Sequence, residues 1–311
     1  MHGRNNENVE GDYIYQSKNI KKSFIVEKAE DCKFTQFLRY LPSGGTKSAY
    51  DYTIFGCGAE LVYESAWCGM NIHKVKFSYW NYGVSDVEYC FGSHFSQNLF
   101  GCIGLQHKKY CILNKQYTKK EYEELLPKIK KHMEGFPYLD AKGNVYRYGE
   151  FFPSELSPFE YNQTIAQEFC PLSKEQSIKQ KFGWYESKEK QMTDFRHWKD
   201  LPDNIQNADE QYLTKPILCK AYEENPTQAL QHNCSKIFKI IPQELAFYQK
   251  QGLPLPRYCP NTRHFHKLKQ LNPFRLCLRK CQNCKATIET TYPPDRPEIV
   301  YCEPCYLKAV Y

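Results

Sequence analysis

Residues 85–113 read SDVEYCFGSHFSQNLFGCIGLQHKKYCIL. In this stretch the pair Asp86-Val87 is followed, after a short strand-like segment, by the similar pair Asn98-Leu99. A polar residue, then an apolar or small one, then a strand-like run, recurs throughout the first third of the chain. The eight pairs are Asn19-Ile20, Asp31-Cys32, Ser48-Ala49, Glu60-Leu61, Asn71-Ile72, Asp86-Val87, Asn98-Leu99 and Lys109-Tyr110. We measure the interval from the second residue of one pair to the second residue of the next. In five of the seven cases this interval equals that from Val87 to Leu99 or is one residue shorter. This spacing predicts short strands at a regular period.

Residues 1–116 are therefore expected to form an irregular, β-helix-like solenoid in a mainly β protein. A short strand and a turn fill one interval, and two intervals would make a coil of about 22–24 residues, within the range of stacked repeats. One coil cannot bury its apolar face alone, so successive coils must stack around a continuous core. The competing interpretation is an antiparallel sandwich or barrel of short strands. We favour the solenoid.

A helix is predicted directly after the last coil, in residues 117–135. Thr118 is suited to the N-cap, and Glu121 completes a capping box with it. The helix would cover the open end of the solenoid, as terminal elements of repeat proteins must. Residues 136–215 are expected to be a connecting region with short helices. Two small α+β modules should follow, a degenerate zinc-ribbon-like segment at 216–275 and a zinc ribbon at 276–311.

Two CxxC motifs lie in the last module. They are Cys281-Gln-Asn-Cys284 and Cys302-Glu-Pro-Cys305, separated by the segment 285–301. The i, i+3 spacing lets a tight turn place both sulfurs on one side of a metal ion, and two such turns supply a tetrahedron. Soft thiolates favour zinc over hard cations. Four thiolates leave no open coordination position, so the motifs predict one structural, non-catalytic zinc ion.

A second group of cysteines precedes this ribbon. Cys219, Cys234 and Cys259 are widely spaced and have no CxxC partner, since Thr262 stands at the partner position after Cys259. The candidates for a fourth ligand are His264 and His266, which follow Cys259, and His232, which precedes Cys234. A second zinc site of Cys219, Cys234, Cys259 and His264, and a degenerate site without metal, both stay open.

The remaining cysteines, the hydropathy and the N-terminus indicate the class of protein. No apolar run approaches the roughly 18–20 residues of a membrane span, and MHGRNNENVEGDY has no signal-peptide core. The total of 15 cysteines is odd, which argues against a disulfide framework. We expect a cytoplasmic protein without membrane contact. Free cysteine commonly packs as a small buried hydrophobe, and this is the expected role of Cys32, Cys57, Cys68, Cys90, Cys102, Cys111, Cys170 and Cys277.

Positive charge is concentrated at the C-terminal end. The net charge is +7, yet the stretch from Arg257 to Ile288 holds eight basic residues and no acidic one. Lys and Arg there could contact phosphates, while interleaved aromatic rings stack on unpaired bases. The candidate nucleic-acid-binding residues are Arg257, Arg263, Lys267, Lys269, Arg275, Arg279 and Lys280. The alternative is that these side chains only solvate a small domain.

Four phrases of the sequence carry a family resemblance. They are CIGLQHKKYCILNKQYTKKEYEEL, GEFFPSELSPFEYNQTIAQE, IIPQELAFYQKQGLPLPRYCP and DRPEIVYCEPCY. In these phrases the chain resembles uncharacterised bacterial proteins from environmental genomes, which have short Cys/Tyr-rich repeats and a C-terminal CxxC…CxxC zinc ribbon. The resemblance implies the architecture and zinc binding but no reaction. Such proteins also carry CxxC pairs in the first ribbon, where this chain has Gln231 and Thr262.

Three classes of function are compatible with these features. The favoured hypothesis is a non-catalytic, zinc-binding protein-interaction scaffold in which zinc stabilises the fold. The alternative is binding of RNA or DNA through residues 257–288. The third is an enzyme that uses the solenoid face, for which Cys90 with His94 or His73 would be the nucleophile pair. No catalytic residue is predicted, and the partner is expected to be a protein or a nucleic acid.

Overall fold

The computed structural model describes residues 2–39, 45–56, 58–186 and 194–310. These residues form two compact units, one of Met1–Leu156 with Pro273–Tyr311 and one of Ser157–Asn272. The first contains the large sheet and the CxxC hairpin, and the second contains short helices and a two-stranded sheet. Among the described residues, no helix is both long and apolar enough to cross a bilayer.

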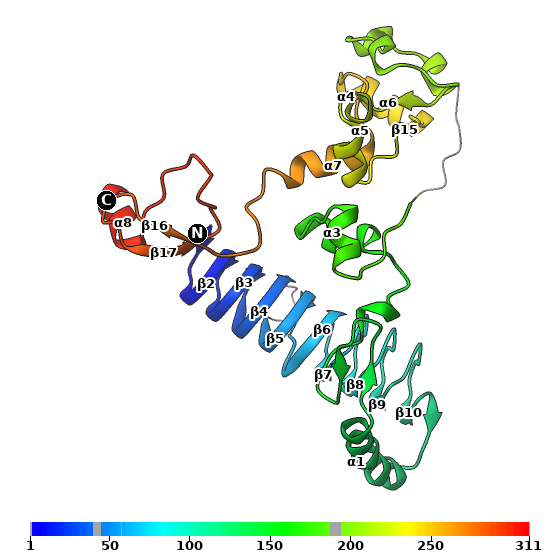
Figure 1. Ribbon diagram of the computed structural model, residues 1–311, viewed down its shortest axis with the longest axis vertical. Helices are drawn as coiled ribbons and strands as arrows, with labels where there is room; N and C mark the ends of the chain where they lie inside the picture. The colour runs from blue at the N-terminus through cyan, green and yellow to red at the C-terminus, as the bar shows by residue number, and fades with distance from the viewer. Residues whose placement is uncertain (1, 40–44, 57, 187–193, 311) are drawn as a thin grey trace. The chain divides into compact units, whose positions relative to one another are not determined.

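The predicted β-solenoid is confirmed. Strands β2 to β10 stack in chain order, each hydrogen-bonded to the next (Figure 1). Pairing is parallel throughout, except where the last short strand β11 folds back on β10. The strands are β1 (Gly3–Arg4), β2 (Glu7–Tyr15), β3 (Lys18–Glu27), β4 (Ala29–Arg39), β5 (Thr46–Gly56), β6 (Val62–Cys68), β7 (His73–Lys76), β8 (Ser85–Glu88), β9 (Gln97–Phe100), β10 (Lys109–Ile112) and β11 (Lys115–Gln116).

The coil is half as long as the sequence indicated. Ser85 pairs with Gln97, and Gln97 pairs with Lys109, so each strand pairs with the strand that lies one interval later in the chain. One interval therefore makes a whole coil, and the expected coil of about 22–24 residues was wrong. The longer step from Cys32 to Ala49 contains residues 40–44, which lie outside the described residues.

A three-residue unit explains the short coil. Every third residue adopts the left-handed conformation, with φ between 50° and 62° at Asp86, Tyr89, Gly92, Phe95 and Asn98. This conformation turns the chain sharply. The residue after each of these five points inward and is buried, namely Val87, Cys90, Ser93, Ser96 and Leu99. Four such triplets complete one coil.

The polar–apolar pairs found in the sequence are these turning points. In six of the eight pairs the first residue is left-handed and the second is buried. Glu60-Leu61 and Lys109-Tyr110 are each one residue early. There the left-handed residues are Leu61 and Tyr110, and the inward residues are Val62 and Cys111.

Small polar side chains hold the interior together. Ser78 Oγ donates to the Lys76 carbonyl at 2.7 Å and accepts from the Cys90 amide of the next coil at 3.1 Å. The Cys90 thiol donates to the Glu88 carbonyl at 3.3 Å in the same way. Serine and cysteine thus make the same contact at these inward positions, because each is small and can donate to the carbonyl two residues earlier.

The packing role predicted for the scattered cysteines is largely confirmed. The buried ones are Cys32, Cys68, Cys90, Cys102 and Cys111. Cys170 is exposed, so the prediction was wrong there. Cys277 is half-buried, and Cys57 lies outside the described residues.

The capping helix is confirmed as α1 (Lys119–Gly135). Thr118 is its N-cap and forms the capping box with Glu121. Tyr122, on the side facing the solenoid, is buried against Phe100 and Ile112 of the last coils. Figure 1 shows α1 at the β10 end of the stack. Lys130 of this helix also contacts Glu88 of β8, at 2.8 Å.

The other elements are short. In the first unit they are β12 (Tyr138–Leu139), β13 (Val145–Tyr146), η1 (Ser154–Leu156), β16 (Cys277–Lys280), β17 (Thr287–Thr290) and α8 (Glu303–Val310). In the second unit they are η2 (Tyr161–Gln163), α2 (Ala166–Phe169), α3 (Lys174–Lys179), η3 (Trp198–Asp200), η4 (Ile205–Asn207), η5 (Glu210–Leu213), β14 (Ile217–Leu218), α4 (Lys220–Glu224), α5 (Pro226–Gln231), β15 (Ile237–Phe238), α6 (Pro242–Gln251) and α7 (Pro260–Leu268).

Candidate metal centres

The CxxC hairpin positions four cysteines through two local turns. Strands β16 and β17 pair antiparallel, and Cys281 and Cys284 lie in the connection between them. Lys285 is left-handed, with φ 62°, and its amide donates to the Cys281 carbonyl at 3.0 Å. This turn brings Cys284 back beside Cys281. Cys302 precedes α8, and Cys305 lies in its first turn.

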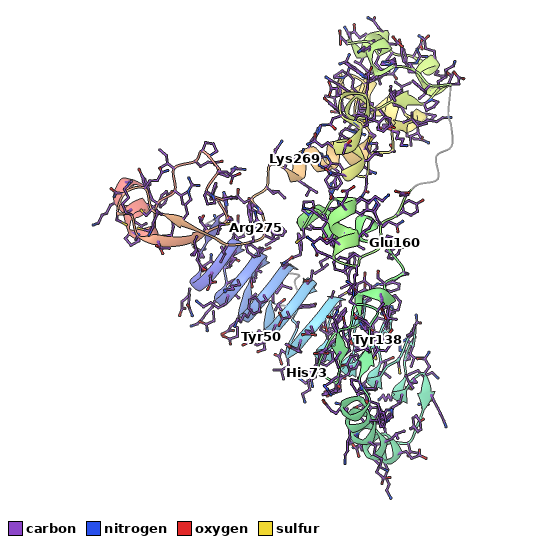
Figure 2. The ribbon with its side chains drawn as sticks, viewed as in Figure 1. Tyr50, His73, Tyr138, Glu160, Lys269 and Arg275 are labelled. Atoms are coloured by element: carbon purple, nitrogen blue, oxygen red, sulfur yellow. The ribbon has the colours of Figure 1, made fainter. Side chains whose placement is uncertain are left out.

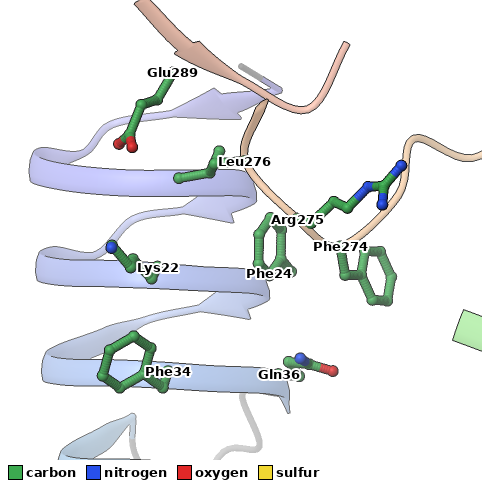
Figure 3. A pocket seen from close by; sticks show the side chains of 8 residues that line it. All are labelled: Lys22, Phe24, Phe34, Gln36, Phe274, Arg275, Leu276 and Glu289. Carbon is green, nitrogen blue, oxygen red and sulfur yellow. The ribbon is translucent and has the colours of Figure 1, made fainter. Parts of the chain in front are cut away.

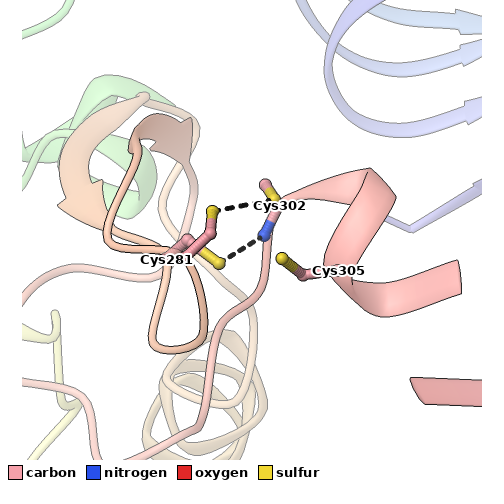
Figure 4. Close-up of side chains that lie close together, drawn as sticks. Cys281, Cys302 and Cys305 are labelled. Carbon is pink, nitrogen blue, oxygen red and sulfur yellow. Dashed lines mark hydrogen bonds between the residues drawn. The ribbon is translucent and has the colours of Figure 1, made fainter. Parts of the chain in front are cut away.

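The four sulfur atoms converge as the sequence indicates. All lie within 4.8 Å of one another, a spacing that could hold one metal ion. Figure 4 shows Cys281, Cys302 and Cys305 facing one point from the turn and from the start of α8. The Cys302 amide donates to Cys281 Sγ at 3.2 Å, and Cys284 Sγ is 3.6 Å from Cys302 Sγ. N–H donors of this kind stabilise thiolates that bind a metal.

The environment of Cys281 favours its ionised form. Burial opposes ionisation, but the amides of Cys302, Cys284 and Asn283 point at this sulfur and outweigh that effect. Together they lower the pKa of the Cys281 thiol to about 6. A metal-binding cysteine must be deprotonated, so one member of the group is ready for coordination near neutral pH.

The loop between the CxxC motifs is held by Arg279. Its guanidinium donates to the carbonyls of Pro293, Arg296 and Glu298 at 2.8–3.2 Å. Arg296 in turn forms an ion pair with Glu298. These contacts order the loop that carries the chain from β17 to Cys302, so Arg279 has a structural role in this hairpin.

The three earlier cysteines also come together, in the second unit. Cys219 directly follows β14, Cys234 lies between α5 and β15, and Cys259 is the N-cap of α7. Pairing of Ile217 with Phe238 brings the first two segments side by side. The three sulfur atoms lie within 4.8 Å of one another and all three residues are buried.

Thr262 shares this site. Its hydroxyl Oγ1 is 3.2 Å from Cys259 Sγ and 3.7 Å from Cys219 Sγ. Cys259 Sγ is 3.6 Å from Cys234 Sγ. Interactions with the Cys219 and Cys234 side chains lower the pKa of Cys259, and they outweigh the opposing effect of burial.

His264 lies elsewhere, which corrects the expected ligand set. Its Nε2 is 3.1 Å from Glu168 Oε2, and its side chain is half exposed. On helix α7 it lies two residues beyond Thr262, so its side chain leaves the helix in a different direction. His232 stacks on Phe265 with ring centroids 4.9 Å apart, and neither histidine belongs to the metal-ligand groups found among the described residues.

The candidate nucleic-acid-binding residues are divided between the two units, whose boundary falls after Asn272. Figure 2 labels Lys269 and Arg275, one from each unit. Four of the seven have intramolecular partners: Arg257 with Asp203, Arg263 with Glu244, Arg279 with three carbonyls and Lys280 with Thr287. Lys267, Lys269 and Arg275 have no such ion pair or hydrogen bond within the described ranges.

A shallow pocket lies beside Arg275 in the first unit. It has a volume of about 300 Å³ and is lined by β3 and β4 residues, by the 274–276 segment and by Glu289 (Figure 3). Phe274 stacks on Phe24, with ring centroids 5.6 Å apart, and forms its apolar wall. Lys22 and Arg275 supply two cations, and Glu289 one opposing charge. Sequence reasoning missed this pocket because its walls are far apart in the chain.

The residues proposed for an enzyme do not form a nucleophile pair. Cys90 points into the solenoid and is fully buried. His94 points outward, where its ring stacks on Tyr82 at 4.8 Å. His73 is also on the outer surface (Figure 2). The wall of the coil separates the cysteine from both histidines.

No protein-family model, no curated protein and no solved structure matches the chain. The resemblance to bacterial proteins with CxxC ribbons stays a prediction.

Proposed function

We propose that this protein is a non-catalytic protein-interaction scaffold whose C-terminal hairpin is stabilised by one zinc ion. The observation that carries the interaction is an uncharged, aromatic outer face on the solenoid. The zinc ion is supported by the four converging sulfurs of Cys281, Cys284, Cys302 and Cys305. Four thiolates complete a tetrahedron and leave no position for a substrate or a reactive water.

The proposed docking face is formed by the residues on either side of the inward residues Cys68, Asn81, Ser93 and Leu105. The sixteen outward positions beside them, at 66–67, 69–70, 79–80, 82–83, 91–92, 94–95, 103–104 and 106–107, include no Asp, Glu, Lys or Arg. Equivalent positions pair from coil to coil, as in Tyr79 with Phe91 and Phe91 with Ile103. The exposed side chains, here called the aromatic face, are Trp67, Met70, Tyr79, Trp80, Phe91, Phe95 and Ile103.

This face has the properties of a protein-binding surface. Trp80 is 42% exposed, and Phe95 and Ile103 are each 62% exposed. Contiguous exposed apolar surface of this kind usually marks an interaction site. Aromatic residues and Met are enriched at the centres of protein interfaces, whereas charges are depleted there. We therefore infer a protein partner that contributes apolar side chains.

Nucleic-acid binding remains the alternative and has less support. The aromatic face has no cation to neutralise phosphates, and phosphate contacts dominate nucleic-acid affinity. In the basic run at 257–288, four of the seven candidate side chains are already engaged within the chain. Lys267, Lys269 and Arg275 would be the residues that remain for phosphate contacts.

The proposal can be tested by site-specific photo-crosslinking in native cells. A photoreactive amino acid is placed at Phe95 on the aromatic face or, as the matched control, at exposed Lys74 on a charged side of the solenoid. We expect discrete protein adducts from position 95 that are scarce from position 74. The second substitution Trp80→Ala should weaken these adducts, because loss of an aromatic residue at an interface centre typically costs about 2 kcal/mol or more.

Two results would contradict the proposal. Equal adducts from both positions would remove the distinction between the faces. Adducts that disappear after nuclease treatment, and that depend on Lys269 and Arg275, would favour the nucleic-acid alternative.

A further inference from the structure

The second unit contains a group of side chains that packing alone does not explain. Cys219, Cys234 and Cys259 come from three separate segments, and their sulfurs meet within 4.8 Å. Thr262 completes the group and is 1% exposed. Buried cysteines are common as small hydrophobes, but they then have no reason to converge on one point with a hydroxyl.

We propose that Cys219, Cys234 and Cys259 bind one zinc ion as thiolates, with Thr262 Oγ1 in the fourth position. Binding releases three thiol protons to solvent. The ion and the three thiolates then carry a net charge of −1, and the threonine hydroxyl is a neutral oxygen ligand. This site is independent of the CxxC hairpin and of the aromatic face.

The distances fit a tetrahedral centre. Zinc lies about 2.3 Å from sulfur and about 2.1 Å from oxygen. In a regular tetrahedron these lengths place two sulfurs about 3.8 Å apart, and a sulfur and an oxygen about 3.6 Å apart. The observed Cys259–Cys234 sulfur separation is 3.6 Å. The Thr262 hydroxyl is 3.2 and 3.7 Å from the sulfurs of Cys259 and Cys219, so small side-chain shifts would admit the ion.

The backbone around the site supports thiolates. The Cys259 amide donates to Cys219 Sγ at 3.3 Å, and the Thr262 amide donates to Cys259 Sγ at 3.4 Å. Helix α7 begins beside Cys259, so the positive end of its dipole also favours negative charge there. These donors partly offset the remaining charge of the bound centre.

No histidine supplies the fourth ligand in this arrangement. His264 is paired with Glu168, and the ring of His232 packs on Phe265. Thr262 is the polar side chain that touches two of the three sulfurs.

A metal ion would also add stability to this unit. Its two strands have two residues each, and α6, its longest described helix, has ten. Short elements bury little apolar surface each, and the free energy of metal binding adds to the folding free energy. The three cysteines are part of the main core cluster of the unit.

The test uses the full chain loaded with Co²⁺ in place of zinc. The thiolate-to-cobalt absorbance in the near ultraviolet counts the bound thiolates, and the visible bands report the ligand set. Four proteins are compared: the wild type, Thr262→Cys, Thr262→Val and, as the control, His264→Ala. The Thr262 variants keep all three cysteines and a side chain of similar size, so the fold should persist.

We expect two cobalt ions per chain in the wild type and in His264→Ala. Thr262→Cys should raise the near-ultraviolet absorbance by about one-seventh, because eight thiolates replace seven, and should make the second ion at least about tenfold more resistant to a chelator. Thr262→Val should shift the visible bands. One ion per chain in the wild type would overturn the proposal. So would loss of an ion in His264→Ala, or visible bands that are the same in Thr262→Val and the wild type.

Discussion

Replacement of Leu99 by alanine tests the solenoid register quantitatively. Leu99 is fully buried and lies between Val87 and Cys111 of the neighbouring coils. The hydrogen-bonded coils on both sides limit collapse into the cavity, so the substitution should cost about 3 kcal/mol, within the usual range for Leu→Ala. With a urea m-value of about 2 kcal/mol/M, the unfolding midpoint should fall by about 1.5 M.

Leu113→Ala is the matched control. It deletes the same atoms from a side chain at a left-handed position, and Leu113 is 74% exposed. Its effect should stay within about 0.5 kcal/mol. Urea unfolding followed by circular dichroism measures both variants. Equal midpoint shifts would refute the assignment of Leu99 to the interior and with it the three-residue unit.

Three further predictions concern the turns, the hairpin and the cap. Asn98→Val should destabilise the solenoid by about 1–2 kcal/mol, because a β-branched residue is strained at φ 54°, whereas Asn98→Gly should be nearly neutral in the same urea assay. Cys284→Ser should make the hairpin sensitive to limited proteolysis and leave the solenoid resistant. Simultaneous cleavage of the hairpin and the solenoid would argue against a metal ion that stabilises the hairpin alone. The backbone and side chain of Thr118 hold the pKa of Glu121 below its usual value. The backbone amides at the start of α1 should therefore be protected from hydrogen exchange at neutral pH, and they should lose this protection as the pH falls through the lowered pKa. Hydrogen exchange measures this loss, which should not occur in Thr118→Ala, where the cap is already absent at neutral pH.

The sequence was sufficient to predict a solenoid but not its coil length. Inward residues recur at every third position, but many of them are Ser, Cys or Asn. Apolar residues therefore do not recur at that period in the sequence. Lys, Tyr and Phe also adopt the left-handed conformation here, as at Lys74, Tyr89 and Phe95. These residue types give no local signal for that turn, because the hydrogen bonds between coils impose it.

The two cysteine groups differ in how far the sequence specifies them. A CxxC motif is a local turn, so the convergence of Cys281 with Cys284 follows from spacing alone. The meeting of Cys219, Cys234 and Cys259 depends on the pairing of β14 with β15 and on the start of α7. Threonine is not an expected zinc ligand, so His264 was the reasonable candidate until the structure placed Thr262 between the sulfurs.

The zinc content of the full chain, purified under reducing conditions, tests the central claim most directly. Elemental analysis should find two zinc ions per chain in the wild type and one in Cys284→Ser. Less than about half an equivalent in the wild type would contradict both metal–thiolate centres.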